Sequence, residues 1–109
     1  MRIPKRFKIF GQTITVVQIE EPFIEKDGYE GFASYRQNKI ELRPGIEGDK
    51  REHIFLHELT HFLIYYSESA YQYKPDSYMH KDEGFIELLA GLLHQALTTM
   101  EYEDEIESI

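Results

Sequence analysis

The chain has 109 residues and a mass of 13.0 kDa, enough for one domain with a modest core. Its hydrophobic fraction of 41% and aromatic fraction of 14% are typical of a globular protein and exclude a disordered one. The net charge of −8 repels phosphate backbones, so we expect no nucleic acid among its partners. No apolar stretch resembles a membrane span or the core of a secretion signal, which predicts a cytoplasmic protein without membrane contact.

The N-terminal half has the pattern of two β-hairpins. Residues 7–10 and 13–20 read as strands on either side of a turn at Gly11-Gln12. Residues 31–36 and 39–43 form a second pair of strand-like runs. We therefore expect a small antiparallel β-meander of about four strands.

The C-terminal half has the apolar periodicity of two helices. The first is expected over residues 50–66 with Asp49 as its N-cap, and the second over residues 83–100 with Asp82 as its N-cap. Residues 67–81 lack helical periodicity and are expected to form a loop.

These elements predict an α+β fold in which the meander packs on two helices. One domain should span residues 1–109, with the acidic residues 101–109 fraying from its end. The sequence gives no indication of the oligomeric state.

The first helix carries an HExxH sequence at His57-Glu58-Leu59-Thr60-His61. A spacing of four residues places the two histidines on one helix face, about 6 Å apart along the axis, which suits two imidazoles on one Zn²⁺. Glu58 projects about 100° away, where it can act as general base on zinc-bound water instead of as a ligand. Because cysteine is absent, further ligands must be His or carboxylate, a donor set that also accepts Mn²⁺ or Fe²⁺.

A catalytic zinc ion typically has three protein ligands and one open position, so a third ligand is required. The second helix offers Glu83 and Glu87, one turn apart, and their distances along the chain from His61 allow either. His53 lies one turn before His57, about 12 Å along the axis from His61, and is too far away to share the ion.

The HExxH helix followed by residues 83–93 resembles the core of the ImmA/IrrE-type metallopeptidases, small gluzincin-like zincins carried by phages and mobile elements. The resemblance covers about residues 30–97. In that family a Glu three residues before Ala-Asn is the third ligand, which implies Glu87, although Gly91 stands where Asn is usual. A competing likeness to the thermolysin-type Glu-x-x-x-Asp arrangement implies Glu83 as the ligand, with Glu87 orienting a histidine.

The resemblance implies a zinc-dependent endopeptidase that hydrolyses peptide bonds of a specific protein partner, such as a phage or mobile-element regulator. The alternative is a catalytically inactive, zincin-like metal-binding interaction module. A third interpretation is a metal-free domain that binds a partner. It requires the HExxH motif to have arisen by chance.

Two further features of the catalytic site are expected. The loop between the helices should supply the donor for the developing oxyanion, with four candidates: Tyr71, Tyr73, Tyr78 and His80. The strand over residues 39–43, just before the metal helix, is the expected sheet edge for an extended peptide substrate.

Overall fold

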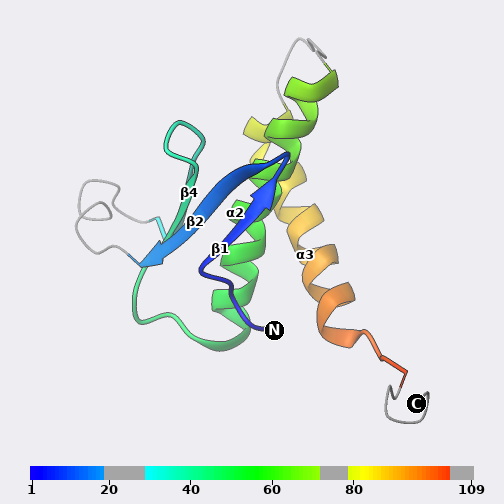
Figure 1. Cartoon of the computed structure of the whole chain (residues 1–109). Coiled ribbons are helices and arrows are strands. Elements are labelled where there is room, and N and C mark those ends of the chain that lie inside the picture. Colours follow the sequence, from blue (N-terminus) through cyan, green and yellow to red (C-terminus); the bar gives the residue numbers. More distant parts are fainter. Residues whose placement is uncertain (19–28, 72–78, 104–109) are drawn as a thin grey trace.

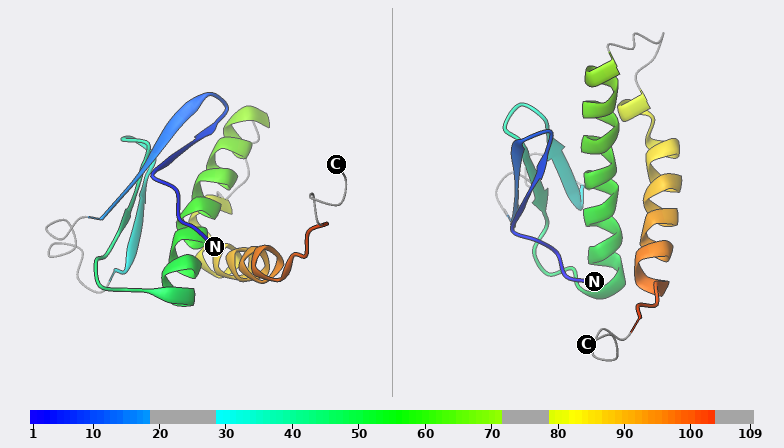
Figure 2. Two further views of the ribbon diagram at one scale, coloured as in Figure 1. Left: turned by 60° about the horizontal axis from the view of Figure 1, so that its bottom comes forward. Right: turned by 45° about the vertical axis from the view of Figure 1, so that its right-hand side comes forward.

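The structure, a computed structural model, describes residues 1–18, 29–71 and 79–103 (Figure 1). Helix α2 (Gly48–Tyr71) lies at the centre, with a four-stranded sheet on one side and helix α3 (Glu83–Thr99) on the other (Figures 1 and 2). The predicted α+β fold, with about four strands and two helices, is confirmed.

The strands are β1 (Arg6–Ile9), β2 (Gln12–Gln18), β3 (Gly31–Ser34) and β4 (Lys39–Leu42), in the order β1-β2-β4-β3. Both predicted hairpins are present, since β1 pairs with β2 and β3 with β4 in antiparallel register. The turn of the first hairpin lies at Phe10-Gly11, one residue earlier than predicted.

The two hairpins join through a parallel pairing of β2 with β4, in which Val16 lies opposite Ile40. The sheet is therefore mixed, and the expectation of a purely antiparallel meander is wrong at this junction. Burial explains the arrangement, because Ile14, Ile40 and Leu42 are almost completely buried and all lie on the two central strands. Strand β3 is left at one edge of the sheet.

Helix α2 continues to Tyr71, five residues beyond the predicted end, so the expected loop is wrong for residues 67–71. A short 3-10 helix, η1 (Met79–Lys81), occupies the other end of that loop, and residues 72–78 lie outside the described part. Asp49 lies within the first turn of α2 instead of capping it.

Helix α3 begins at Glu83 as predicted, because the side chain of Asp82 accepts a hydrogen bond from the amide of Phe85 at 3.0 Å. It ends at Thr99, and residues 101–103 of the acidic tail are exposed and non-helical. Residues 104–109 lie outside the described part.

The core lies between the sheet and α2. Phe55, Leu56 and Phe62 of α2 pack against the buried residues of β2 and β4, and Ala90 of α3 joins the same cluster. Since both flanks of α2 are covered, the HExxH segment is held by packing from two sides. Within the described residues, no helix combines the length and apolar character needed to cross a bilayer.

Candidate metal centre

The two histidines of the HExxH segment lie together on one edge of α2, as its helical geometry requires. Their ring centroids are 5.0 Å apart. His61 is 7% exposed, and burial lowers its pKa, although its hydrogen bond to a backbone carbonyl opposes this. The neutral imidazole that binds metals is thereby favoured at His61.

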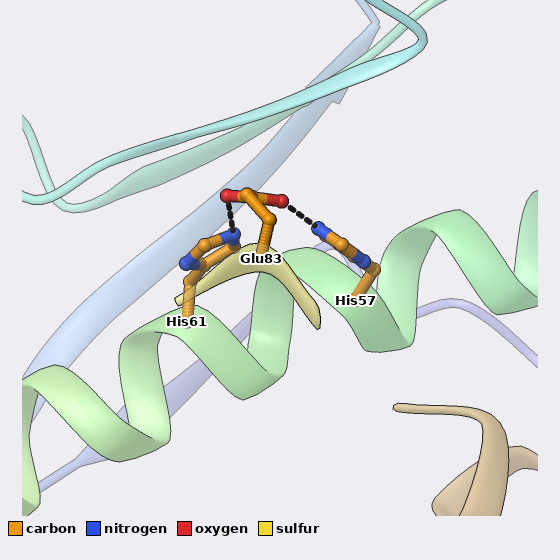
Figure 3. A group of neighbouring side chains, drawn as sticks. All are labelled: His57, His61 and Glu83. Atoms are coloured by element: carbon orange, nitrogen blue, oxygen red, sulfur yellow. Dashed lines mark hydrogen bonds and ion pairs between the residues drawn. The ribbon is translucent and has the colours of Figure 1, made fainter. Parts of the chain in front are cut away.

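Glu83, at the start of α3, lies between the two rings (Figure 3). One carboxylate oxygen is 3.0 Å from Nε2 of His61, and the other is 3.0 Å from Nε2 of His57. One donor atom from each of the three residues lies within 4.8 Å of the others. Two imidazoles and one carboxylate are a donor set that zinc uses in catalytic sites, so these residues fit a divalent metal ion.

The second ring nitrogen of each histidine also has an acceptor. Nδ1 of His61 donates to the backbone carbonyl of His80 at 2.6 Å, and Nδ1 of His57 donates to Glu87 at 2.8 Å. An acceptor at Nδ1 favours the tautomer in which Nε2 carries the lone pair. Both lone pairs then face Glu83.

Glu87 is held between two histidines of α2. One of its oxygens accepts from His57, and the other contacts Nε2 of His53. Desolvation opposes ionisation, but hydrogen bonds and charge from His53 and His57 lower the pKa of Glu87. The structure thus brings Glu83 to the two Nε2 atoms and Glu87 to the outer side of His57, the arrangement of the thermolysin-type alternative.

Glu58 lies on the sheet side of α2 and is 7% exposed. Burial, reinforced by the negative charges of Glu83 and Glu87, raises the pKa of Glu58 to about 8. Gly31 of β3 makes its position possible: a Cβ there would lie 2.7 Å from Cγ2 of Ile54 and 3.1 Å from a carboxylate oxygen of Glu58. The edge strand can approach the helix this closely only with glycine.

An open cleft of about 990 Å³ runs between β3 and the two helices. His57, Glu58, His61 and Glu83 line one side of it, and the residues of β3 line the other. The expectation that residues 39–43 form the edge beside the site is wrong, because β4 lies between β2 and β3. The parallel pairing of β2 with β4 places β3 at that edge instead.

Of the four predicted oxyanion donors, the structure describes the side chain of His80 alone. Tyr73, Tyr78 and the side chain of Tyr71 lie outside the described residues. His80 is 7% exposed, and its Nδ1 lies 2.8 Å from a carboxylate oxygen of Glu68. Its ring is therefore engaged in a hydrogen bond with Glu68, while its backbone carbonyl orients His61.

Tyr35 also lines the cleft, and sequence reasoning missed it. Its ring stacks on Tyr65 at 4.3 Å and makes edge contacts with Phe62 and His80 at 5.2 and 5.3 Å. Burial and the negative charges of Glu58 and Glu83 raise its pKa, so the phenol keeps its proton. No motif marks this residue; it follows β3 by one position and reaches the site only through the sheet order.

A second group of potential ligands comprises Asp49, Glu52 and His94. Nε2 of His94 lies 3.0 Å from Glu52, whose pKa is lowered by this hydrogen bond. The contact joins the start of α2 to the C-terminal half of α3, and His94 is half-buried. None of these three residues lines the cleft.

Comparison of the chain with protein-family models, with curated proteins and with solved structures found no match. A functional proposal therefore rests on the chemistry of these residues.

Proposed function

We propose that the protein is a zinc-dependent metallopeptidase that hydrolyses peptide bonds of a specific protein partner. The convergence of His57, His61 and Glu83 beside the buried carboxylate of Glu58 carries the proposal. A structural zinc site has four protein ligands and no use for an adjacent base, whereas a catalytic site has three ligands and an open position. The resemblance of the two helices to the ImmA/IrrE-type enzymes supports the same activity.

In this proposal Glu83 is the third ligand and Glu87 orients His57. Glu83 is the carboxylate that contacts both Nε2 atoms, and Glu87 accepts from the opposite ring nitrogen of His57. A carboxylate behind a ligating imidazole fixes the ring orientation and raises the basicity of the ligand. His53 in turn holds the other oxygen of Glu87.

The reaction adds water across an amide bond. A bound zinc ion supplies Lewis acidity that activates water and polarises the carbonyl. Glu58 accepts a proton from the attacking water and delivers it to the leaving amine nitrogen as the C–N bond breaks. A neighbouring cation favours the ionised form that Glu58 needs at the start of this cycle. The protonated phenol of Tyr35 is our candidate donor for the developing oxyanion.

An extended substrate would add to the sheet along β3. Among the described strands this one forms the sheet edge beside Glu58, and its residues line the cleft. Main-chain hydrogen bonds to an edge strand bind a peptide without reading its sequence closely. An open cleft in so small a domain leaves most of the specificity to docking of the partner, so we expect poor cleavage of generic substrates such as casein.

The first test is the metal content of protein purified without added metal or chelator. We expect close to one zinc ion per chain in the wild type, none in Glu83→Ala, and a reduced amount in Glu87→Ala. Glu103→Ala, an exposed acidic residue outside the site, is the matched control and should retain zinc. Wild-type protein that is empty and takes up no zinc on titration would refute the proposal.

The second test separates an enzyme from an inactive metal-binding module. A library of protein-derived peptides is incubated with zinc-loaded wild type and with zinc-loaded Glu58→Gln, and new N-termini are identified by mass spectrometry. The protein concentration is kept high, because cleavage without a docked partner should be slow. New termini that appear with the wild type alone support the peptidase. Zinc binding without new termini in either sample favours the interaction module.

A further inference from the structure

Several large apolar side chains of helix α3 remain exposed instead of packing against the rest of the molecule. Its buried residues are Ile86 and Ala90, which face α2. Leu88 and Leu92 are 62% and 55% exposed. Large apolar side chains at such exposures are unusual when they share one face of a helix.

The two leucines belong to one continuous stripe that also includes the partly buried Phe85 and the exposed Ala96. Phe85, Leu88, Leu92 and Ala96 are separated by three, four and four residues, so they lie along one side of α3 over about 16 Å. The middle of this side is rotated by about 145° from Glu87, which lines the cleft. We refer to these four residues as the α3 stripe.

No described element covers the side of α3 that is turned away from α2. Both views in Figure 2 show the sheet beyond α2, and the contacts of α3 are chiefly with α2 and η1. The α3 stripe is thus an apolar helix face about three turns long that lacks a partner among the described residues.

The segment of the chain that contains the stripe and follows it carries one sign of charge. Residues 82–109 contain eight of the 20 acidic residues and none of the 12 Lys and Arg residues. The other 12 acidic residues balance the 12 basic ones, so this segment carries the whole net charge of −8. Glu101 and Glu103, which directly follow α3, are exposed.

We propose that the α3 stripe docks a basic amphipathic helix of a protein partner. An apolar stripe with helical spacing fits the apolar face of another helix, and the acidic residues that follow α3, Glu101 and Glu103 among them, favour Lys and Arg on that partner. A second copy of this chain would bring two segments of charge −8 together, which like-charge repulsion opposes. Anionic lipid surfaces and nucleic acids are disfavoured for the same reason. The docking surface does not depend on a metal ion.

The test uses the full chain and a synthetic 18-residue peptide with leucines at three- and four-residue spacing and lysines elsewhere. Binding is measured by fluorescence anisotropy at 0.15 M salt and again at 0.5 M salt. We expect saturable binding to the wild type, at least tenfold weaker binding to Leu88→Gln/Leu92→Gln, and weaker binding at the higher salt concentration. Phe10→Asn is the matched control, because Phe10 is 71% exposed on the turn between β1 and β2. It should bind like the wild type.

Two further peptides distinguish specific docking from non-specific electrostatic attraction. A peptide of the same composition, with its leucines scattered around the helix, should bind at least tenfold more weakly, and one with Glu in place of Lys should not bind. Equal binding of the scattered peptide, unchanged binding of the double variant, or no binding by the wild type would each overturn the proposal. So would sedimentation showing a wild-type dimer that Leu88→Gln/Leu92→Gln dissociates, since a second copy would then be the occupant.

Discussion

Among the described residues, two groups of His and carboxylate residues have donor atoms within 4.8 Å of one another, but their surroundings differ. In the group of His57, His61 and Glu83, each imidazole has an acceptor at Nδ1, and a buried carboxylate stands beside the cleft. The group of Asp49, Glu52 and His94 lies outside the cleft, and its His–Glu contact ties two helices together. Proximity of ligand atoms is therefore a weak criterion. The orientation of the rings, their burial and their access to the cleft make the first group the candidate reaction centre.

The largest effect should separate the two groups by chemistry, since only the first lies beside Glu58, the proposed general base. Glu58→Gln should retain zinc and lose cleavage by about 10²–10⁴-fold, the usual contribution of such a group. The test measures the turnover of a peptide identified in the library experiment. It uses protein whose zinc content has been verified. Activity that survives in Glu58→Gln would show that another residue takes the proton.

The next prediction compares one carboxylate from each group. Glu83→Ala should weaken zinc binding by more than about 100-fold, beyond the range for residues that only orient a ligand. Asp49→Ala should leave zinc affinity unchanged. Competition with a chromogenic zinc chelator measures both. Equal losses in the two variants would mean that zinc occupies the second group as well.

A smaller effect is expected for the residues that act through a histidine. Glu87→Gln should weaken zinc binding by about 10–100-fold, because His57 loses a charged acceptor while the ligands remain. Glu52→Gln replaces the charged acceptor of His94 with a neutral one, so it should lower the melting temperature slightly without changing zinc affinity. If Glu87→Gln abolished zinc binding as completely as Glu83→Ala, Glu87 would be a ligand.

The smallest predicted effect concerns the contact between the edge strand and the helix. Gly31→Ala should destabilise the fold by about 1–3 kcal/mol, because its new methyl group overlaps Ile54 and crowds Glu58. Urea unfolding of the metal-free protein measures this loss. Ala33→Ser, on the same strand, is the control and should change stability less. Unchanged stability in Gly31→Ala would show that β3 can move away from α2 at little cost.

Local patterns were sufficient for much of the fold. Alternation and turn residues gave both hairpins, and Asp82 marked the start of α3, because these features depend on contacts between near neighbours. The sequence did not reveal that β2 pairs with β4, since the order of strands depends on which ones bury their side chains most completely. The extension of α2 to Tyr71 was missed for a similar reason, since the hydrogen bond of Glu68 with His80 is a tertiary contact.

The sequence by itself determined that His57 and His61 share a helix face with Glu58 beside them, because the pitch of an α-helix dictates that geometry. It left Glu83 and Glu87 equivalent, one turn apart on another helix. The tertiary structure alone decided which carboxylate contacts which ring nitrogen, that the carbonyl of His80 orients His61, and that β3 and Tyr35 border the cleft. These contacts depend on how α3 is rotated against α2 and on the strand order, and both are set by packing between segments distant in the chain.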